Sequence, residues 1–180
     1  MEVISSSIKE AALAIKNGKV LACPTDTVYG LICDADNSKA SARIYLIKKR
    51  SKSNPLPVFV KSIAAAKELA EINESQEKFL KNVWPGRTTV ILKSRKRGTI
   101  GLRMPSFGFL LKLIKHTGPL VETSANLSGS APALSTEDVL EQFINNKHQP
   151  DIIIDGGRLK TLKPSRVIDL TKNKPIILRK

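Results

Sequence analysis

The chain has 180 residues, a length that suits one domain with a sizeable hydrophobic core. Hydrophobic residues make up 41% of it and aromatic residues only 4%, so we expect the core to be mainly aliphatic. Thirty basic against 16 acidic residues give a formal net charge of +14, which points to a polyanionic partner or substrate; the alternative is that the surface lysines serve solubility alone.

Signals for membrane insertion and for secretion are missing from this sequence. No stretch approaches the length of a membrane-spanning helix, and residues 1–15 hold no unbroken apolar run of the kind found in signal peptides. Cys23 and Cys33 lie in apolar runs without the spacing of metal ligands, which favours buried, reduced thiols over a disulfide. We therefore expect a cytoplasmic protein without a membrane partner.

Apolar periodicity predicts helices and strands that alternate along the chain. Gly18 is a stop signal for the first helix, and Ser38 and Thr136 are predicted to cap two later ones. The predicted helices cover residues 8–15, 38–49, 63–70, 75–83, 107–114 and 136–143. The predicted strands cover residues 19–23, 58–60, 90–93, 99–103, 119–121, 151–154, 167–170 and 175–178. This order predicts an α/β fold, with a single domain over residues 1–180 in which a twisted mixed sheet is flanked by helices.

Residues 121–129, Val-Glu-Thr-Ser-Ala-Asn-Leu-Ser-Gly, form a short polar segment at the end of a predicted strand. Small hydroxyl and amide side chains beside backbone N–H groups suit an anion such as a phosphate or a carboxylate. Taken alone, the segment is equally compatible with an ordinary turn. Further blocks at element boundaries offer hydroxyls, cations or both, and we expect them to converge with it: residues 23–31, 46–57, 84–89 and 99–105.

Cations gather where the predicted helix over residues 38–49 ends. One or two of them would serve to offset the negative end of the helix dipole, but Lys48, Lys49, Arg50 and Lys52 together exceed that need. Arg50 offers a planar fork for phosphate oxygens and Lys48 a point charge, both expected at an exposed helix end. Asn54 follows in a loop constrained by proline, available to bond a nucleotide or a sugar.

The polar blocks contain no histidine that could act as a general base. His116 and His148 both lie outside them, which disfavours a Ser-His-Asp triad, and no phosphate-binding or nucleophile-elbow glycine motif is found. The blocks instead provide positioning and charge neutralisation. Those two effects, with a metal sharing the load, suffice for adenylyl transfer.

Six motifs, taken in order, cover nearly the whole chain. They are Pro-Thr-Asp-Thr-Val-Tyr-Gly-Leu at 24–31, Lys-Lys-Arg at 48–50 with Asn-Pro-Leu at 54–56, Trp-Pro-Gly at 84–86, Leu-Arg-Met-Pro at 102–105, Ser-Ala-Asn-Leu-Ser-Gly at 124–129, and Ser165 ahead of a strand ending in Leu-Arg. In this pattern the chain resembles the YrdC/TsaC family of threonylcarbamoyl-AMP synthases, in its short, single-domain branch. The resemblance implies a YrdC-like fold.

The resemblance also implies a reaction. Family members are nucleotidyltransferases that condense L-threonine, bicarbonate and ATP into threonylcarbamoyl-AMP and pyrophosphate, for the threonylcarbamoyladenosine modification of tRNA beside the anticodon. ATP would thus be a substrate, accompanied by Mg²⁺, and no residue is implied as a metal ligand. The implied partners are tRNA or another structured RNA and downstream threonylcarbamoyl-transfer proteins.

Site residues follow from the resemblance position by position. Lys48, Arg50, Ser124 and Asn126 match a catalytic tetrad. Contacts with L-threonine are implied for Thr27, Arg103, Ser165 and Glu122, the last through its backbone while its side chain faces elsewhere. Nucleotide contacts are implied for Arg50, Asn54, Thr99, Ser124 and Arg179. Phe59 stands where many members have histidine, and we expect it to give an apolar contact to the threonine methyl group.

Two other classes remain open from the residues. A non-catalytic RNA-binding protein could use the net charge of +14, although few aromatic side chains are present to stack on bases. A carbamoyl-transfer module of the kind found in hydrogenase-maturation proteins shares the fold. The absence of acylphosphatase and zinc-finger segments makes that class less suitable.

Overall fold

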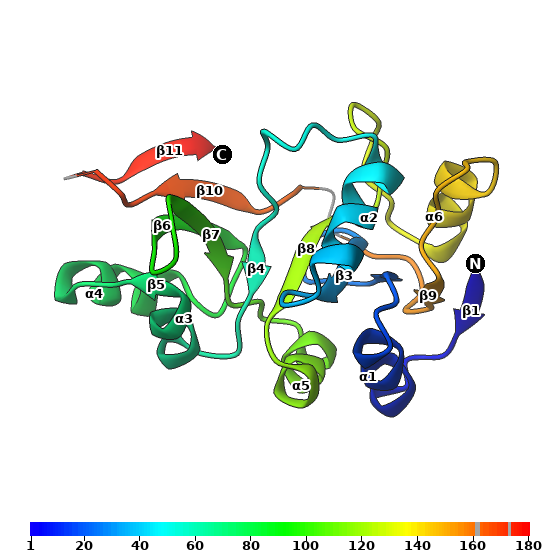
Figure 1. The fold of residues 1–180 in the computed structure, drawn as a ribbon, viewed down its shortest axis with the longest axis horizontal. Coiled ribbons are helices and arrows are strands. Elements are labelled where there is room, and N and C mark those ends of the chain that lie inside the picture. Colours follow the sequence, from blue (N-terminus) through cyan, green and yellow to red (C-terminus); the bar gives the residue numbers. More distant parts are fainter. Residues whose placement is uncertain (161–162, 173) are drawn as a thin grey trace.

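One mixed β-sheet runs through the whole molecule in the computed structural model, which describes residues 1–160, 163–172 and 174–180 (Figure 1). Within those residues the sheet has 11 strands, in the order β1-β9-β2-β3-β8-β4-β7-β6-β10-β11, with β5 paired to β6. The strands are β1 (Glu2–Ile4), β2 (Leu21–Cys23), β3 (Gly30–Asp34), β4 (Val58–Phe59), β5 (Ala70–Glu71), β6 (Thr88–Ser94), β7 (Thr99–Arg103), β8 (Leu120–Ser124), β9 (Ile152–Ile154), β10 (Arg166–Asp169) and β11 (Ile176–Arg179).

The sheet mixes parallel and antiparallel pairs, as the sequence predicts. β9 lies parallel to β1 and β2, β4 parallel to β7, and β6 parallel to β10, whereas β3 and β4 both run antiparallel to β8. Strands β1, β3 and β5 were not predicted. β3 is buried along almost its entire length between β2 and β8, so its sequence has no alternation of apolar and polar residues.

Six helices are present in the described part of the chain, each with both ends within three residues of a predicted one. They are α1 (Ile8–Lys16), α2 (Ser38–Lys48), α3 (Ile63–Leu69), α4 (Glu74–Val83), α5 (Gly108–Thr117) and α6 (Thr136–Phe143). The two predicted caps are wrong by one residue. Asn37 caps α2 and Ser135 caps α6, because a capping residue has extended backbone and its side chain accepts from an N–H inside the helix.

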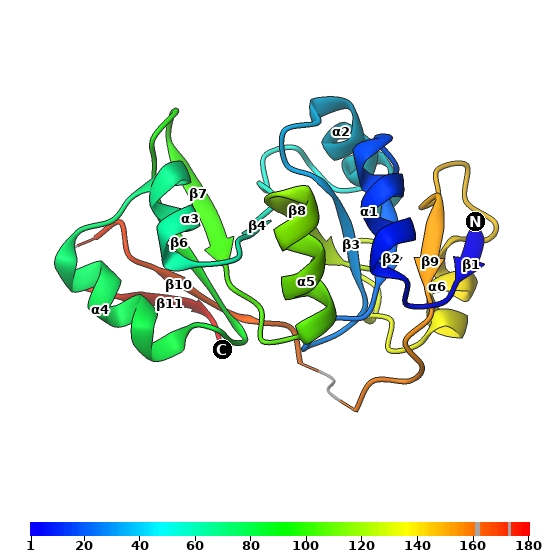
Figure 2. The same ribbon diagram turned by 90° about the horizontal axis from the view of Figure 1, so that it is seen from below.

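Two hydrophobic clusters hold the helices to the sheet. Helices α1 and α5 lie side by side on one face, where they pack in one cluster with the inner residues of β2, β3 and β9 (Figure 2). The second cluster takes in the apolar faces of α2, α3, α4 and α6. Both are mainly aliphatic, as expected, and Cys23 and Cys33 are buried and free within them. No helix among the described residues is long and apolar enough to cross a bilayer.

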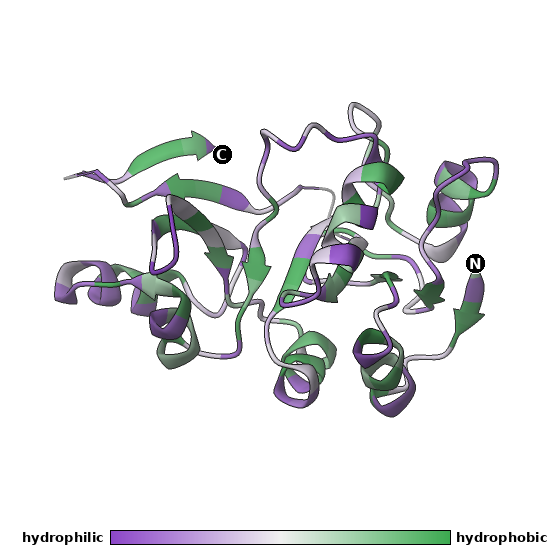
Figure 3. Ribbon diagram, in the orientation of Figure 1, coloured by the Kyte–Doolittle hydropathy of each residue, from purple (hydrophilic) through white to green (hydrophobic). Residues whose placement is uncertain are grey.

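The last strand carries a run of apolar side chains that face solvent. Ile176, Ile177 and Leu178 are 45%, 55% and 57% exposed, and Figure 3 shows β11 as a hydrophobic strip at the outer edge of the sheet. Antiparallel pairing with β10 keeps it in place, and Val167 stands opposite Arg179. This pairing places Arg179, the next-to-last residue of the sequence, beside β10.

Removal of a core side chain from α6 should be costly. Phe143 is fully buried, so Phe143→Ala should lower the free energy of unfolding by about 3–5 kcal/mol in a urea titration. The matched control is Ile144→Ala on the next residue, which is 58% exposed and should cost less than about 0.5 kcal/mol. Equal losses in the two variants would contradict the burial described for α6.

Candidate functional site

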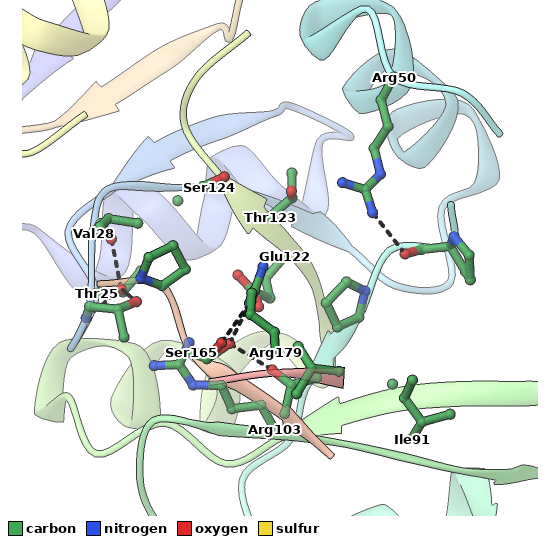
Figure 4. A pocket seen from close by; sticks show the side chains of 18 of the residues that line it. Thr25, Val28, Arg50, Ile91, Arg103, Glu122, Thr123, Ser124, Ser165 and Arg179 are labelled. Carbon is green, nitrogen blue, oxygen red and sulfur yellow. Dashed lines mark hydrogen bonds between the residues drawn. The ribbon is translucent and has the colours of Figure 1, made fainter. Parts of the chain in front are cut away.

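A cavity of about 220 Å³ lies over the middle of the sheet (Figure 4). Its walls come from the loop between β2 and β3, the segment after α2, and the strands β6, β7, β8, β10 and β11. Three guanidinium groups, one carboxylate and several hydroxyls line it. The polar members are Thr25, Thr27, Arg50, Thr89, Thr99, Arg103, Glu122, Thr123, Ser124, Ser165 and Arg179.

Most of the site residues predicted from the sequence meet in this cavity although they come from segments far apart in the chain. Those that line it are Thr27, Arg50, Thr99, Arg103, Glu122, Ser124, Ser165 and Arg179. Lys48, Asn54 and Asn126 do not line it. The polar blocks converge because each stands at the end of a strand or helix that reaches the same region of the sheet.

Arg103 is the most deeply buried cation of the site, with 1% of its surface exposed. It forms an ion pair with Asp26, and its Nε donates to the carbonyl oxygen of Gly86 at 3.1 Å. The Asp26 carboxylate also accepts from the N–H and the hydroxyl of Ser106 at 3.0 and 2.8 Å. Sequence reasoning did not assign Asp26, although its place between two threonines of the first motif was a signal that could have found it.

Phe59 does not have the position expected of it. Its side chain is fully buried and is not part of the cavity wall. The guanidinium carbon of Arg103 lies 5.4 Å from the centre of its ring, a cation–π arrangement. Phe59 is therefore not placed to give the apolar contact with the threonine methyl group that was expected of it, and its ring packs against Arg103 instead.

Glu122 also differs from expectation. Its backbone N–H donates to the carbonyl oxygen of Pro57 at 2.9 Å, and its side chain, expected to face elsewhere, lines the cavity. The residue is only 8% exposed. Burial raises the pKa of its carboxyl, and the positive charges of Arg103 and Arg179 oppose that rise.

The loop after β2 presents two threonine hydroxyls to the cavity. Thr25 Oγ1 donates to the carbonyl oxygen of Val28 at 2.7 Å and accepts from the N–H of Thr27 at 3.0 Å. The hydroxyl oxygens of Thr25 and Thr27 are 2.9 Å apart. These bonds close a tight turn, so the two hydroxyls have little freedom to move.

Arg179 and Ser165 are held together at the other side of the cavity. Arg179 Nε donates to the backbone oxygen of Ser165 at 2.8 Å and its Nη2 to the Ser165 hydroxyl at 3.2 Å. The Thr89 hydroxyl lies 2.9 Å from the Ser165 hydroxyl. Arg179 is held in the sheet because β11 pairs with β10, where Val167 stands opposite it.

Lys48 is not at an exposed helix end, as the sequence had suggested, but is 2% exposed. Its ammonium donates to the backbone oxygens of Ser124 and Asn126, the latter at 2.7 Å, and to Asn126 Oδ1 at 3.3 Å. Burial and the nearby charge of Arg50 lower the pKa of Lys48 to about 8. These hydrogen bonds from Lys48 hold the polar turn after β8 in place.

Asn126 completes that turn. Its side-chain nitrogen donates to the backbone oxygens of Leu127 and Ser130 at 2.8 and 2.7 Å. Both polar ends of the amide are therefore used inside the turn. Asn126 and Lys48 together position Ser124, which is the member of the three that reaches the cavity.

Arg50 reaches the cavity from the segment after α2, where Lys49 ends the helix with a left-handed backbone, φ +51°. Its Nε donates to the backbone oxygen of Asn54 at 3.0 Å and its Nη2 to that of Pro55 at 3.3 Å. Asn54 thus acts here through its carbonyl group, and its exposed side chain lies outside the cavity. Nη1 of Arg50 makes no hydrogen bond with any of the described residues.

Metal-ligating side chains are sparse in this region. Within the described residues, no group of three or more histidine, cysteine, aspartate or glutamate side chains is placed to hold a metal ion. The described residues of the cavity wall include a single carboxylate, that of Glu122. The side chains present are suited to anions and to an amino acid.

Comparison with known proteins agrees with this chemistry. A family model described as "Telomere recombination", built on Sua5, YciO and YrdC proteins, matches residues 13–180. A threonylcarbamoyl-AMP synthase of Pyrococcus abyssi is 37% identical over 96% of this chain and 53% of its own length. A putative threonylcarbamoyl-AMP synthase of Methanocaldococcus jannaschii is 32% identical over 92% of this chain and 81% of its own length.

A solved structure gives the same picture of the fold. The crystal structure of P. abyssi Sua5 complexed with L-threonine has a TM-score of 0.89 at 35% identity, over 99% of this chain and 56% of that one. The chain therefore spans about half the length of the Pyrococcus relatives it matches. Because the family model and both relatives cover nearly all of its sequence, the chain belongs to the Sua5/YciO/YrdC family.

Proposed function

We propose that this chain is an L-threonylcarbamoyladenylate synthase, a nucleotidyltransferase that forms threonylcarbamoyl-AMP from L-threonine, bicarbonate and ATP with release of pyrophosphate. The observation that carries the proposal is the meeting of Arg50, Arg103 and Arg179 with Ser124 in one cavity. Relatives named as threonylcarbamoyl-AMP synthases, and one solved with L-threonine, support it. The same relatives favour this activity over a non-catalytic RNA-binding protein.

The amino acid would lie against the buried wall of the cavity. Arg103 donates its Nε proton to Gly86 and one Nη2 proton to Asp26. Its remaining N–H groups are available to the α-carboxylate of the amino-acid substrate. The hydroxyls of Thr27 and Ser165 stand ready to bond the rest of the substrate. Each of these groups is already oriented by the protein, so little ordering is needed on binding.

The nucleotide would lie against the more open wall. Arg50 and Arg179 offer guanidinium N–H groups to phosphate oxygens, and the hydroxyls of Ser124 and Thr99 add neutral donors. In the reaction an oxygen of the threonine carbamate attacks the α-phosphorus of ATP, and the bond to the bridging oxygen of pyrophosphate breaks. The chain's share is to hold threonine, bicarbonate and ATP together and to stabilise the charge that develops.

Magnesium fits this site only as part of the nucleotide. With Glu122 as the sole carboxylate of the described cavity wall, the protein does not offer the oxygen ligands of a dedicated Mg²⁺ site. We propose that the ion arrives on the phosphates of ATP, where it supplies charge neutralisation. Arg50 and Arg179 would then bind the oxygens that the ion leaves uncovered.

The wider setting of the reaction is also a proposal. Every strand that lines the cavity belongs to one sheet, which supports residues 1–180 acting as one catalytic domain. We expect it to work in the cytoplasm, where its product would pass to threonylcarbamoyl-transfer proteins that modify tRNA. Bound RNA is not needed for the chemistry, since no reactant is an RNA.

The decisive measurement is pyrophosphate release from ATP in the absence of RNA. Release should require both L-threonine and bicarbonate, because neither alone can form the carbamate that attacks ATP. Omission of either reactant is the control. Release that ignores threonine, or none with all reactants present, would reject the proposed activity, and salt-resistant, sequence-selective binding in an RNA titration would then favour the RNA-binding class.

Arg50 should matter for the reaction and little for folding. Arg50→Ala should lower kcat/KM by about 2–4 kcal/mol, roughly 30- to 1,000-fold, because a prearranged donor to the phosphates is lost. Its side chain makes only exposed contacts with backbone oxygens, so the melting temperature should hardly change. Lys52→Ala, an exposed cation of the same segment, is the matched control. Full activity of Arg50→Ala would remove Arg50 from the mechanism.

Lys48 should differ from Arg50 because it is buried. Lys48→Ala removes the ammonium donor from the backbone oxygens of Ser124 and Asn126, of which Ser124 keeps the N–H of Asn126, and this loss should lower the free energy of unfolding by roughly 1–3 kcal/mol. Activity should fall as well, since Ser124 loses its support. Urea unfolding of this variant beside Arg50→Ala tests the distinction, and a Lys48→Ala protein as stable as the wild type would show that the turn does not depend on the ammonium.

A further inference from the structure

Glu122 stands out in the cavity as the one acidic side chain of its described wall (Figure 4). Resting on the activity proposed above, we propose that the Glu122 carboxylate binds the α-ammonium group of the amino-acid substrate and takes a proton from it when the amine is carboxylated. Glu122 is then a catalytic residue through its side chain. The assignment from sequence had given a role only to its backbone.

The carboxylate of Glu122 has no partner of its own in the described part of the protein. No described residue donates a hydrogen bond to it or pairs with it within 4.0 Å, whereas Asp26, the neighbouring acid, is saturated by Arg103 and Ser106. Glu122 is 8% exposed, and that exposure is to the cavity. A nearly buried carboxylate that is open only to a cavity favours a cationic ligand in that cavity.

Charge complementarity identifies that ligand as a zwitterion. An α-amino acid carries an ammonium and a carboxylate on one carbon atom, and the cavity offers Glu122 and Arg103 as their opposites. Arg103 lies at the end of β7 and Glu122 in β8, two strands that are both paired to the short strand β4. A ligand that bore only negative charge would leave Glu122 uncompensated.

The surroundings of Glu122 also suit a base. Burial raises the pKa of its carboxyl, and the neighbouring charge of Asp26, on the β2–β3 loop, acts in the same direction. Arg103 on β7, Arg179 on β11 and Lys48 on α2 oppose the rise and favour the charged form. A carboxylate with a raised pKa is a stronger base than an exposed glutamate and is closer to the optimum for proton transfer near neutral pH.

The step balances without any further reactant. Glu122 accepts one proton from the ammonium group, and the freed nitrogen lone pair forms a C–N bond to the bicarbonate carbon. The bicarbonate hydroxyl leaves with a second ammonium proton as water. One ammonium, one bicarbonate and one carboxylate thus give the carbamate, one water and the protonated Glu122.

The test uses Glu122→Gln, which keeps the shape and removes the base. Its kcat/KM for threonine should fall about 100-fold or more near pH 7, the usual contribution of a positioned base. The ratio of wild-type to variant activity should shrink as pH rises toward and past the pKa of the α-ammonium group of free threonine, because an amine that has already lost its proton needs no base. Glu122→Asp should recover part of the loss. Glu68→Gln, an exposed acid of α3, is the charge-matched control.

A purely structural role of Glu122, to balance Arg103 and Arg179, predicts a different result. The defect of Glu122→Gln would then be independent of pH and would appear in nucleotide binding and in melting temperature. That outcome, or a variant as active as the wild type, would overturn the proposal.

A binding measurement separates this proposal from the activity itself. By calorimetry the wild type should prefer L-threonine to N-acetyl-L-threonine, which lacks the ammonium group, and Glu122→Gln should lose that preference. If the wild type releases no pyrophosphate yet shows this preference, the activity fails and the ammonium site stands. If the wild type releases pyrophosphate but does not discriminate between the two ligands, the ammonium site fails alone.

Discussion

The ion pair between Asp26 and Arg103 joins the two walls of the cavity, and the rest of the site depends on it. Asp26 comes from the loop after β2 and Arg103 from the end of β7, on opposite sides of the central strands β8 and β4. Their side chains are 7% and 2% exposed, and an unpaired charge at that depth would cost several kcal/mol. The pairing therefore sets both the distance between the walls and the direction of the guanidinium.

Each cation of the site is held in place by hydrogen bonds to backbone carbonyl oxygens. A carbonyl oxygen fixes the direction of a guanidinium or ammonium group without cancelling its charge, so the group stays available to an anion while its geometry is set in advance. The anchors are Asn54 and Pro55 for Arg50, Gly86 for Arg103, Ser165 for Arg179, and Ser124 and Asn126 for Lys48. Among the residues that the structure describes, Arg103 is the one of these four cations that also has a carboxylate partner, Asp26.

This difference divides the cavity into two electrostatic regions. Around Arg50 and Arg179 the positive charge is uncompensated by any ion pair among the described residues, which suits a polyphosphate. Around Arg103 the acids Asp26 and Glu122 bring the local charge close to neutral, which suits a zwitterion. Two reactants that differ in net charge can thus bind in different regions of the same cavity.

The sequence by itself determined the α/β class, the six helices to within three residues, the convergence of polar blocks at element ends, and the family. These rest on local patterns: apolar periodicity, caps and short motifs. Tertiary structure alone decided the burial of Lys48, the place of Phe59 against Arg103, the role of Asp26, the direction of the Glu122 side chain, and the place of Arg179 beside β10. Each of these depends on which strands lie side by side, and strand pairing between residues far apart in the chain leaves no periodic signal in the sequence that a local reading could detect.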